Sequence, residues 1–117
     1  MRLYTREAFD LFHGQEGRMR DREKSIEAYL RRRVEEAGGV AFKFTAPGND
    51  GVPDRLIILP GGRVTFVELK APGGRLTGIQ RWQQERIRRR GCDVRTIWTK
   101  AQADEFMQEK GGASRGV

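Results

Sequence analysis

The chain has 117 residues, of which 37% are hydrophobic and 33% are charged, and its net charge at pH 7 is +7. This length allows one small domain with a single core. The excess of basic over acidic residues favours a polyanionic partner, of which nucleic acid is the first candidate and an anionic membrane surface the second. No apolar run approaches the roughly 20 residues of a membrane span, no signal-peptide pattern is present, and the single cysteine, Cys92, excludes an internal disulfide or a cysteine-based zinc cluster. We therefore expect no membrane association and a reducing, cytoplasmic location.

Both ends of the chain fall outside any periodic pattern. Residues 1–20 are predicted to be an N-terminal extension and residues 111–117 a disordered tail, which leaves residues 21–110 for the domain itself. The only histidine, His13, lies in the extension before a glycine-rich link. In that setting we expect an exposed histidine and not a metal ligand.

The first periodic segment predicts a helix over residues 21–37. Its apolar residues repeat every four positions, as is typical of one buried helix face: Ile26, Leu30 and Val34. Gly38 and Gly39 then supply a stop signal. Glu23 and Glu27 lie one turn apart at the edge of the apolar face, where the simplest interpretation is a solvated helix edge.

A short strand over residues 40–45 and a loop over residues 46–53 follow, the loop being dense in turn-forming residues. Lys43 alternates with Phe42 and Phe44, so its side chain projects from the opposite face of the strand. If that face carries a nucleic-acid site, Lys43 is a candidate phosphate contact.

The most informative segment reads as two apolar strands, residues 54–59 and 63–70, joined by a Pro-Gly-Gly turn. Three ionisable residues, Asp54, Glu68 and Lys70, interrupt this apolar hairpin without any packing reason. Because side chains alternate along a strand, Glu68 and Lys70 project from one face. A three-residue loop places Asp54 opposite Glu68, whereas a two-residue loop would place Asp54 opposite Leu69, on the wrong face.

Two adjacent carboxylates repel each other unless a cation lies between them. Hard oxygen ligands with room for water favour Mg²⁺, with Mn²⁺ as a substitute, and a neighbouring lysine can stabilise charge on a reacting phosphate or orient the attacking water. The alternative is an edge hairpin with a cross-strand Glu–Lys pair and a capping aspartate. The complete pattern, Pro-Asp54 followed by Glu68-Leu-Lys70 at the polar ends of two apolar strands, is more specific than that alternative requires.

The segment over residues 77–90 predicts a second helix that starts with a capping box formed by Thr77 and Gln80. Trp82 is expected in the core. Basic residues in this helix and in the loop before it exceed what solubility requires, so we expect them to face nucleic acid: Arg75, Arg81, Arg86, Arg88 and Arg89.

A last strand over residues 93–98 and a last helix to about residue 110 complete the chain, with Cys92 expected at or near the core. The element order is helix, three strands, helix, strand, helix. This order predicts an α/β fold with a mixed four-stranded sheet and helices on both faces.

The Pro-Asp54, Glu68-Leu-Lys70 and Gln80 pattern resembles the PD-(D/E)xK nuclease superfamily, and more narrowly its stand-alone VRR-NUC domains from phages and bacteria. The resemblance extends over about residues 22–100. It implies a restriction-endonuclease-like core, Mg²⁺-dependent DNA endonuclease activity and a homodimer similar to Holliday-junction resolvases, acting on branched DNA in replication or repair.

The resemblance also implies residue roles. A glutamate of the first helix joins Asp54 and Glu68 at the metal; Glu27 is the better match, with Glu23 in reserve. The backbone carbonyl of Leu69 completes the ligand set, and Gln80 lies beside the active site, a role that competes with its capping box. Two other functions remain open: a non-catalytic basic DNA-binding module and a restriction-type endonuclease.

Overall fold

The computed structural model describes residues 22–115. The predicted N-terminal extension, including His13, lies outside the described residues, as do the last two residues of the chain. The described elements follow the predicted order: an N-terminal helix (residues 22–36), β1 (Val40–Lys43), β2 (Arg55–Leu59), β3 (Arg63–Leu69), α2 (Gly78–Arg89), β4 (Asp93–Ile97) and α3 (Lys100–Arg115). The helix α3 continues five residues beyond its predicted end at residue 110, into the segment predicted to be disordered.

The four strands form one mixed sheet in the order β1-β2-β3-β4, which confirms the predicted α/β fold. The pairs β1–β2 and β2–β3 are antiparallel, and β3–β4 is parallel. Leu59 pairs with Arg63, so the hairpin has a three-residue loop, which is the register that places Asp54 opposite Glu68. Gly61 and Gly62 adopt φ angles of 91° and 76°, which glycine reaches without the steric cost that other residues incur.

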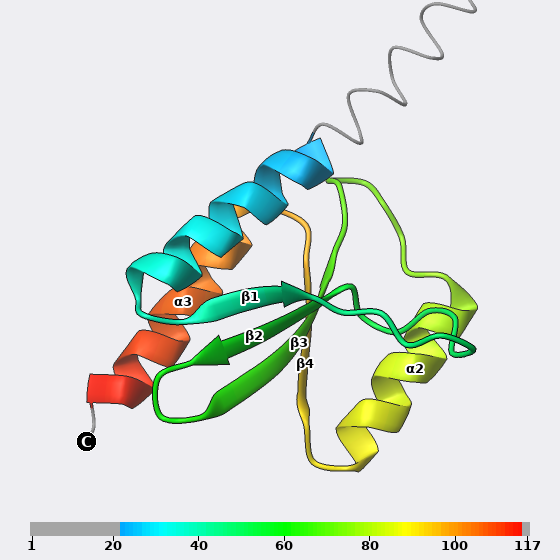
Figure 1. Ribbon diagram of the computed structural model, residues 1–117. Helices are drawn as coiled ribbons and strands as arrows, with labels where there is room; N and C mark the ends of the chain where they lie inside the picture. Colours follow the sequence, from blue (N-terminus) through cyan, green and yellow to red (C-terminus); the bar gives the residue numbers. More distant parts are fainter. Residues whose placement is uncertain (1–21, 116–117) are drawn as a thin grey trace, which may run out of the picture.

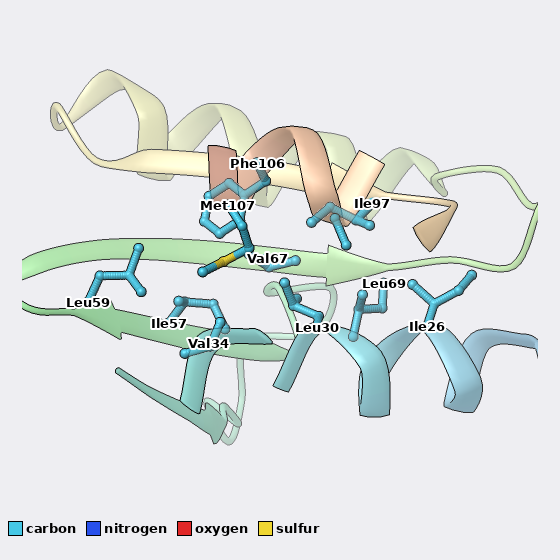
Figure 2. Close-up of a cluster of buried hydrophobic side chains, with 11 residues drawn as sticks. Ile26, Leu30, Val34, Ile57, Leu59, Val67, Leu69, Ile97, Phe106 and Met107 are labelled. Atoms are coloured by element: carbon cyan, nitrogen blue, oxygen red, sulfur yellow. The ribbon is translucent and has the colours of Figure 1, made fainter. Parts of the chain in front are cut away.

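The core lies between the sheet and the two helices on one of its faces, the N-terminal helix and α3 (Figure 1). Alternate side chains of β2 and β3 point into it, together with the apolar stripe of the N-terminal helix (Figure 2). The buried cluster consists of Ile26, Leu30, Val34, Ile57, Leu59, Val67, Leu69, Ile97, Ala103, Phe106 and Met107. The first three of these are the residues whose spacing predicted the helix.

Polar contacts fix α3 to the strands next to it. The carboxylate of Asp93, at the start of β4, accepts hydrogen bonds from Arg95 Nε at 2.7 Å and Thr65 Oγ1 at 2.8 Å, and it forms an ion pair with Lys110 Nζ at 2.7 Å. The guanidinium of Arg95 also donates two hydrogen bonds to Glu109. Since Lys110 and Glu109 belong to α3, these contacts join the last helix to the sheet.

The helix α2 packs on the other face through glutamines and not through its aromatic residue. Gln83 and Gln84 are buried, and Gln84 Nε2 donates to Thr96 Oγ1 of β4 at 2.9 Å. Trp82 is 54% exposed, so its predicted place in the core is wrong. The predicted burial of Cys92 is also wrong, because this residue is exposed in the turn before β4. Within the described residues, no helix has the length and apolarity needed to cross a membrane.

Candidate active site

The hairpin brings the three predicted ionisable residues together at one end of the sheet. Arg55 pairs with Val67, so the preceding residue, Asp54, lies opposite Glu68. The backbone N–H of Leu69 donates to Asp54 Oδ1 at 3.3 Å, which holds the aspartate against the end of β3. Lys70 follows two residues after Glu68 and therefore projects from the same face.

The two carboxylates are in an environment that disfavours their charge. Glu68 is only 5% exposed, and burial, together with the nearby charge of Asp54, raises its pKa to about 8, although the positive charge of Lys70 opposes this shift. Burial also raises the pKa of Asp54, while the hydrogen bond from Leu69 opposes the shift. A bound cation would relieve the unfavourable charge of both groups.

The two glutamates of the N-terminal helix occupy different positions relative to this pair. Glu27 forms an ion pair with Arg55, with 2.7 Å between Oε1 and the guanidinium nitrogen. Glu23 lies close enough to Asp54 and Glu68 for its negative charge to raise the pKa of both. The helix thus presents one glutamate to an arginine and the other to the carboxylate pair.

A cavity of about 110 Å³ opens between the N-terminal helix and the ends of the strands. Its walls contain acidic and basic side chains together with one apolar residue: Glu23, Lys24, Glu27, Lys43, Asp54, Arg55 and Leu69. Lys43 therefore shares the wall of this cavity with Asp54, on the strand face opposite Phe42. The same cavity reaches Leu69, whose carbonyl was predicted as a metal ligand.

The donor set fits a hard divalent cation. Mg²⁺ is commonly bound by one or two carboxylates and completes its coordination with water and substrate phosphates. Asp54 and Glu68 supply such a pair. Among residues 22–115, no three histidine, cysteine, aspartate or glutamate side chains are grouped closely enough to hold a metal by themselves. The remaining ligands would be water, substrate, a backbone carbonyl, or a glutamate of the N-terminal helix whose side chain moves towards the ion.

Gln80 takes part in the predicted capping box. Its Oε1 accepts a hydrogen bond from the Thr77 N–H at 2.9 Å, and its own N–H donates to Thr77 Oγ1 at 3.2 Å. The capping role is therefore confirmed. A role for this side chain at the metal site would have to use its amide nitrogen or replace the cap.

The predicted DNA-binding arginines differ in the contacts that they make within the chain. Arg75 and Arg81 are exposed. Arg86 lies over the Trp82 ring, with 4.7 Å from its guanidinium carbon to the ring centroid. Arg88 donates to Gln84 Oε1 and to the Val94 carbonyl, and Arg89 pairs with Glu85 at 3.3 Å.

Two features of the site were not predicted from the sequence. Arg55, directly after Asp54, neutralises Glu27, although its position in an apolar strand gave no sign of a partner. Gln83 Nε2 donates to the Asp50 carbonyl at 2.9 Å, which ties α2 to the loop that leads into Asp54. A glutamine next to a tryptophan in an arginine-rich helix gives no reason to expect burial.

Comparisons with known proteins point in one direction. No family model matches the chain. A relative named "Putative nuclease p44", from Acyrthosiphon pisum secondary endosymbiont phage 1, is 50% identical over 66 residues, which cover 56% of this chain and 71% of the relative. A solved structure described as "VRR_NUC domain" superposes with a TM-score of 0.70 at 33% identity, over 74% of this chain and 95% of that structure.

Proposed function

We propose that this chain, which belongs to the VRR-NUC family of nucleases, hydrolyses DNA phosphodiester bonds with Mg²⁺ at the Asp54–Glu68–Lys70 site, and that Mn²⁺ can substitute. The observation that carries the metal dependence is the pair formed by the buried Glu68 and the half-buried Asp54. Because the pKa of Glu68 is about 8, keeping its carboxylate ionised at neutral pH costs free energy. A divalent cation held by Glu68 and Asp54 would offset that cost.

Each residue has a distinct role in this proposal. Asp54 and Glu68 would hold the ion, together with the Leu69 carbonyl and a glutamate of the N-terminal helix. When bound, the ion would lower the pKa of a water molecule and neutralise charge on the scissile phosphate. Lys70 positions the attacking water or stabilises the negative charge that develops on the phosphate. Gln80 orients the water or the lysine through its amide.

The helix glutamate that reaches the ion is either Glu27 or Glu23. The sequence pattern favours Glu27, but its carboxylate is engaged by Arg55. Glu23 is coupled electrostatically to both members of the pair. The contacts therefore favour Glu23 as the ligand and Glu27 as the residue that positions Arg55.

The basic residues bind the flanking phosphates. Lys43 lies in the wall of the cavity beside Asp54, and Arg75 lies in the exposed loop between Lys70 and α2. The remaining contacts come from the outer side of α2 and from its partly engaged arginines: Arg81, Arg86, Arg88 and Arg89. Such contacts position DNA without reading its sequence, which suits an enzyme that recognises the shape of branched DNA, including a Holliday junction.

The alternative is a basic DNA-binding module without catalysis, favoured by the arginine density of α2. Such a module has no use for a buried Glu68 next to a half-buried Asp54, since this arrangement costs stability when no cation is bound. Metal-dependent cutting separates the two functions.

The test is a cleavage assay on a labelled four-way junction, a flap and a linear duplex, each with Mg²⁺, Mn²⁺ or EDTA. We expect cutting with either metal, none with EDTA, and at least a ~100-fold loss of rate in Lys70→Ala. Lys100→Ala, an exposed lysine at the start of α3, is the matched control and should keep its activity. Tight binding without cutting under any condition would favour the binding module, and full activity of Lys70→Ala would contradict the mechanism.

A further inference from the structure

Two neighbouring glutamines of α2, Gln83 and Gln84, are buried, although glutamine is mostly found on protein surfaces. Their exposed fractions are 3% and 2%. A buried amide costs free energy unless its donors and acceptors find partners. Both glutamines have such partners, but in different parts of the chain, and only Gln83 reaches the loop that precedes Asp54.

Gln83 joins α2 to the loop between β1 and β2, residues 44–54. Its Nε2 donates to the Asp50 carbonyl at 2.9 Å, and its Oε1 accepts a hydrogen bond from Arg86 at 3.2 Å. Because an arginine side chain can only donate, it fixes the oxygen of the amide on its own side, and the nitrogen then points towards the loop. Both ends of the amide are thus used, and its orientation is determined by its partners.

The backbone of this loop meets α2 at a second point. Gly51 has a φ angle of 85°, and a Cβ atom built on it would lie 3.0 Å from the backbone and the side chain of Ile79, in the first turn of the helix. Both the backbone conformation and the close approach therefore favour glycine here. Gly48, in the same loop, has a φ angle of 81°, but no atom lies within 4 Å of its Cβ position. The loop and α2 lie side by side in Figure 1.

The attached loop leads directly to Asp54. Asp50 and Asp54 are four residues apart, and Pro53, whose ring fixes its φ angle, is fully buried between them. The Asp54 carbonyl accepts a hydrogen bond from the Phe44 N–H at 2.8 Å, and its Oδ1 accepts one from the Leu69 N–H at 3.3 Å. A displacement of the loop at Asp50 is therefore passed along a short, constrained segment to the Asp54 carboxylate.

We propose that Gln83 is a positioning residue for the metal site: through the Asp50 carbonyl, it holds the loop where Asp54 and Glu68 can share one ion. This inference rests on the function proposed above. Mg²⁺ requires near-ideal octahedral geometry, so its affinity depends closely on where its ligands lie. Residues that orient metal ligands through hydrogen bonds typically change metal affinity by roughly 10–100-fold.

Gln84 gives a matched comparison for this role. It follows Gln83 on the same helix, is equally buried, and also has two partners: its Nε2 donates to Thr96 Oγ1 at 2.9 Å, and its Oε1 accepts from Arg88 at 3.2 Å. Neither of these hydrogen bonds involves the loop or Asp54. The same substitution at the two positions therefore removes the same chemistry, and only the change at Gln83 releases the loop.

The first measurement is calorimetric titration of Mn²⁺ into the wild type, Gln83→Met and Gln84→Met. Methionine keeps the length of the side chain but has no N–H to donate. We expect Gln83→Met to bind Mn²⁺ at least about tenfold more weakly, and Gln84→Met to stay within about twofold of the wild type. Urea unfolding should show a similar loss of stability in both variants. Equal Mn²⁺ affinity in the two variants would show a merely structural role and would overturn the proposal.

A second measurement needs no metal. The Leu69 N–H is bonded to the Asp54 carboxylate, so its hydrogen exchange, followed by NMR with EDTA present, reports where that carboxylate lies. In Gln83→Met this N–H should exchange at least about tenfold faster after correction for stability, and in Gln84→Met at the wild-type rate. Unchanged exchange in Gln83→Met would refute the positioning role. Faster exchange in a chain that binds no metal would reject the nuclease mechanism and support the positioning of Asp54 by Gln83.

The loop offers an independent pair of variants, should Gln83→Met fail to fold. Gly51→Ala places a methyl group against Ile79 and should reproduce both effects, weaker Mn²⁺ binding and faster exchange of the Leu69 N–H. Gly48→Ala incurs a similar backbone strain without a neighbour, so it should lose stability but keep the wild-type Mn²⁺ affinity and exchange rate. Equal Mn²⁺ affinity in the two glycine variants would contradict the role of the loop.

Discussion

At the scale of single residues, Glu68 combines a stability cost with a proposed function. Its pKa is about 8 in the folded chain and 4.5 as an ordinary glutamate, so the folded state holds its proton more tightly. Stability without metal should therefore fall as pH rises from about 4.5 to 8 and then level off. In Glu68→Gln this fall should be smaller by a few kcal/mol, because one pKa unit is about 1.4 kcal/mol. Urea unfolding at a series of pH values, with EDTA present, measures this dependence of stability on pH. An equal fall in the wild type and in Glu68→Gln would contradict the conclusion that burial raises the pKa of Glu68.

Glu23 and Glu27 show what spacing alone cannot decide. They lie four residues apart, about 6 Å along the helix axis, and only the position of the helix against the strands determines which one is level with Asp54. We expect Glu23→Gln to raise the Mg²⁺ concentration for half-maximal cutting at least about tenfold. Glu27→Gln should lower the melting temperature, because it removes the ion partner of Arg55, and should affect the metal requirement less. The opposite ranking in a Mg²⁺ titration would restore Glu27 as the ligand.

At the scale of elements, the attachment of α3 depends on Asp93. Burial alone would raise the pKa of Asp93, but bonds from Lys110, Arg95 and Thr65 outweigh it and lower the pKa to about 2, against 3.8 for an ordinary aspartate. The carboxylate therefore contributes about 2 kcal/mol of stability above pH 4, which is lost as pH falls towards 2. Asp93→Asn should be less stable at neutral pH, and the difference should shrink in acid. Glu85→Gln, which removes an exposed ion pair, is the control and should change little.

The helices and strands were predictable because their patterns are local. The sequence left two registers open for the hairpin, and the structure has the one that places Asp54 opposite Glu68. The predictions for Trp82 and Cys92 were wrong for a different reason: apolar character favours burial, but it does not decide which side of a helix or turn faces the sheet. The sheet meets α2 through Gln83 and Gln84, whose hydrogen bonds to Asp50 and Thr96 no periodicity indicates.

At the scale of the whole molecule, the net charge of +7 should govern DNA affinity. If Arg75 and Arg81 each contact a phosphate, replacing either with glutamine should reduce the slope of log affinity against log salt concentration by about 1. Arg31→Gln, on the exposed side of the N-terminal helix, should leave the slope unchanged. Fluorescence anisotropy with a labelled junction in Ca²⁺, across a range of salt, measures the slopes. An equal reduction of the slope in all three variants would mean that DNA affinity depends only on the net charge of the chain.

Catalysis by the proposed mechanism depends on Asp54 and Glu68 holding one cation together. The most direct measurement is calorimetric titration of Mg²⁺ or Mn²⁺ into the protein near neutral pH, in two buffers with different ionisation enthalpies. We predict binding that releases protons, because the ion displaces the proton from a Glu68 whose pKa is about 8, and loss of that binding in Asp54→Asn and in Glu68→Gln. Binding of equal strength in the wild type and both variants would show that the ion lies elsewhere, and the account of the site would be wrong.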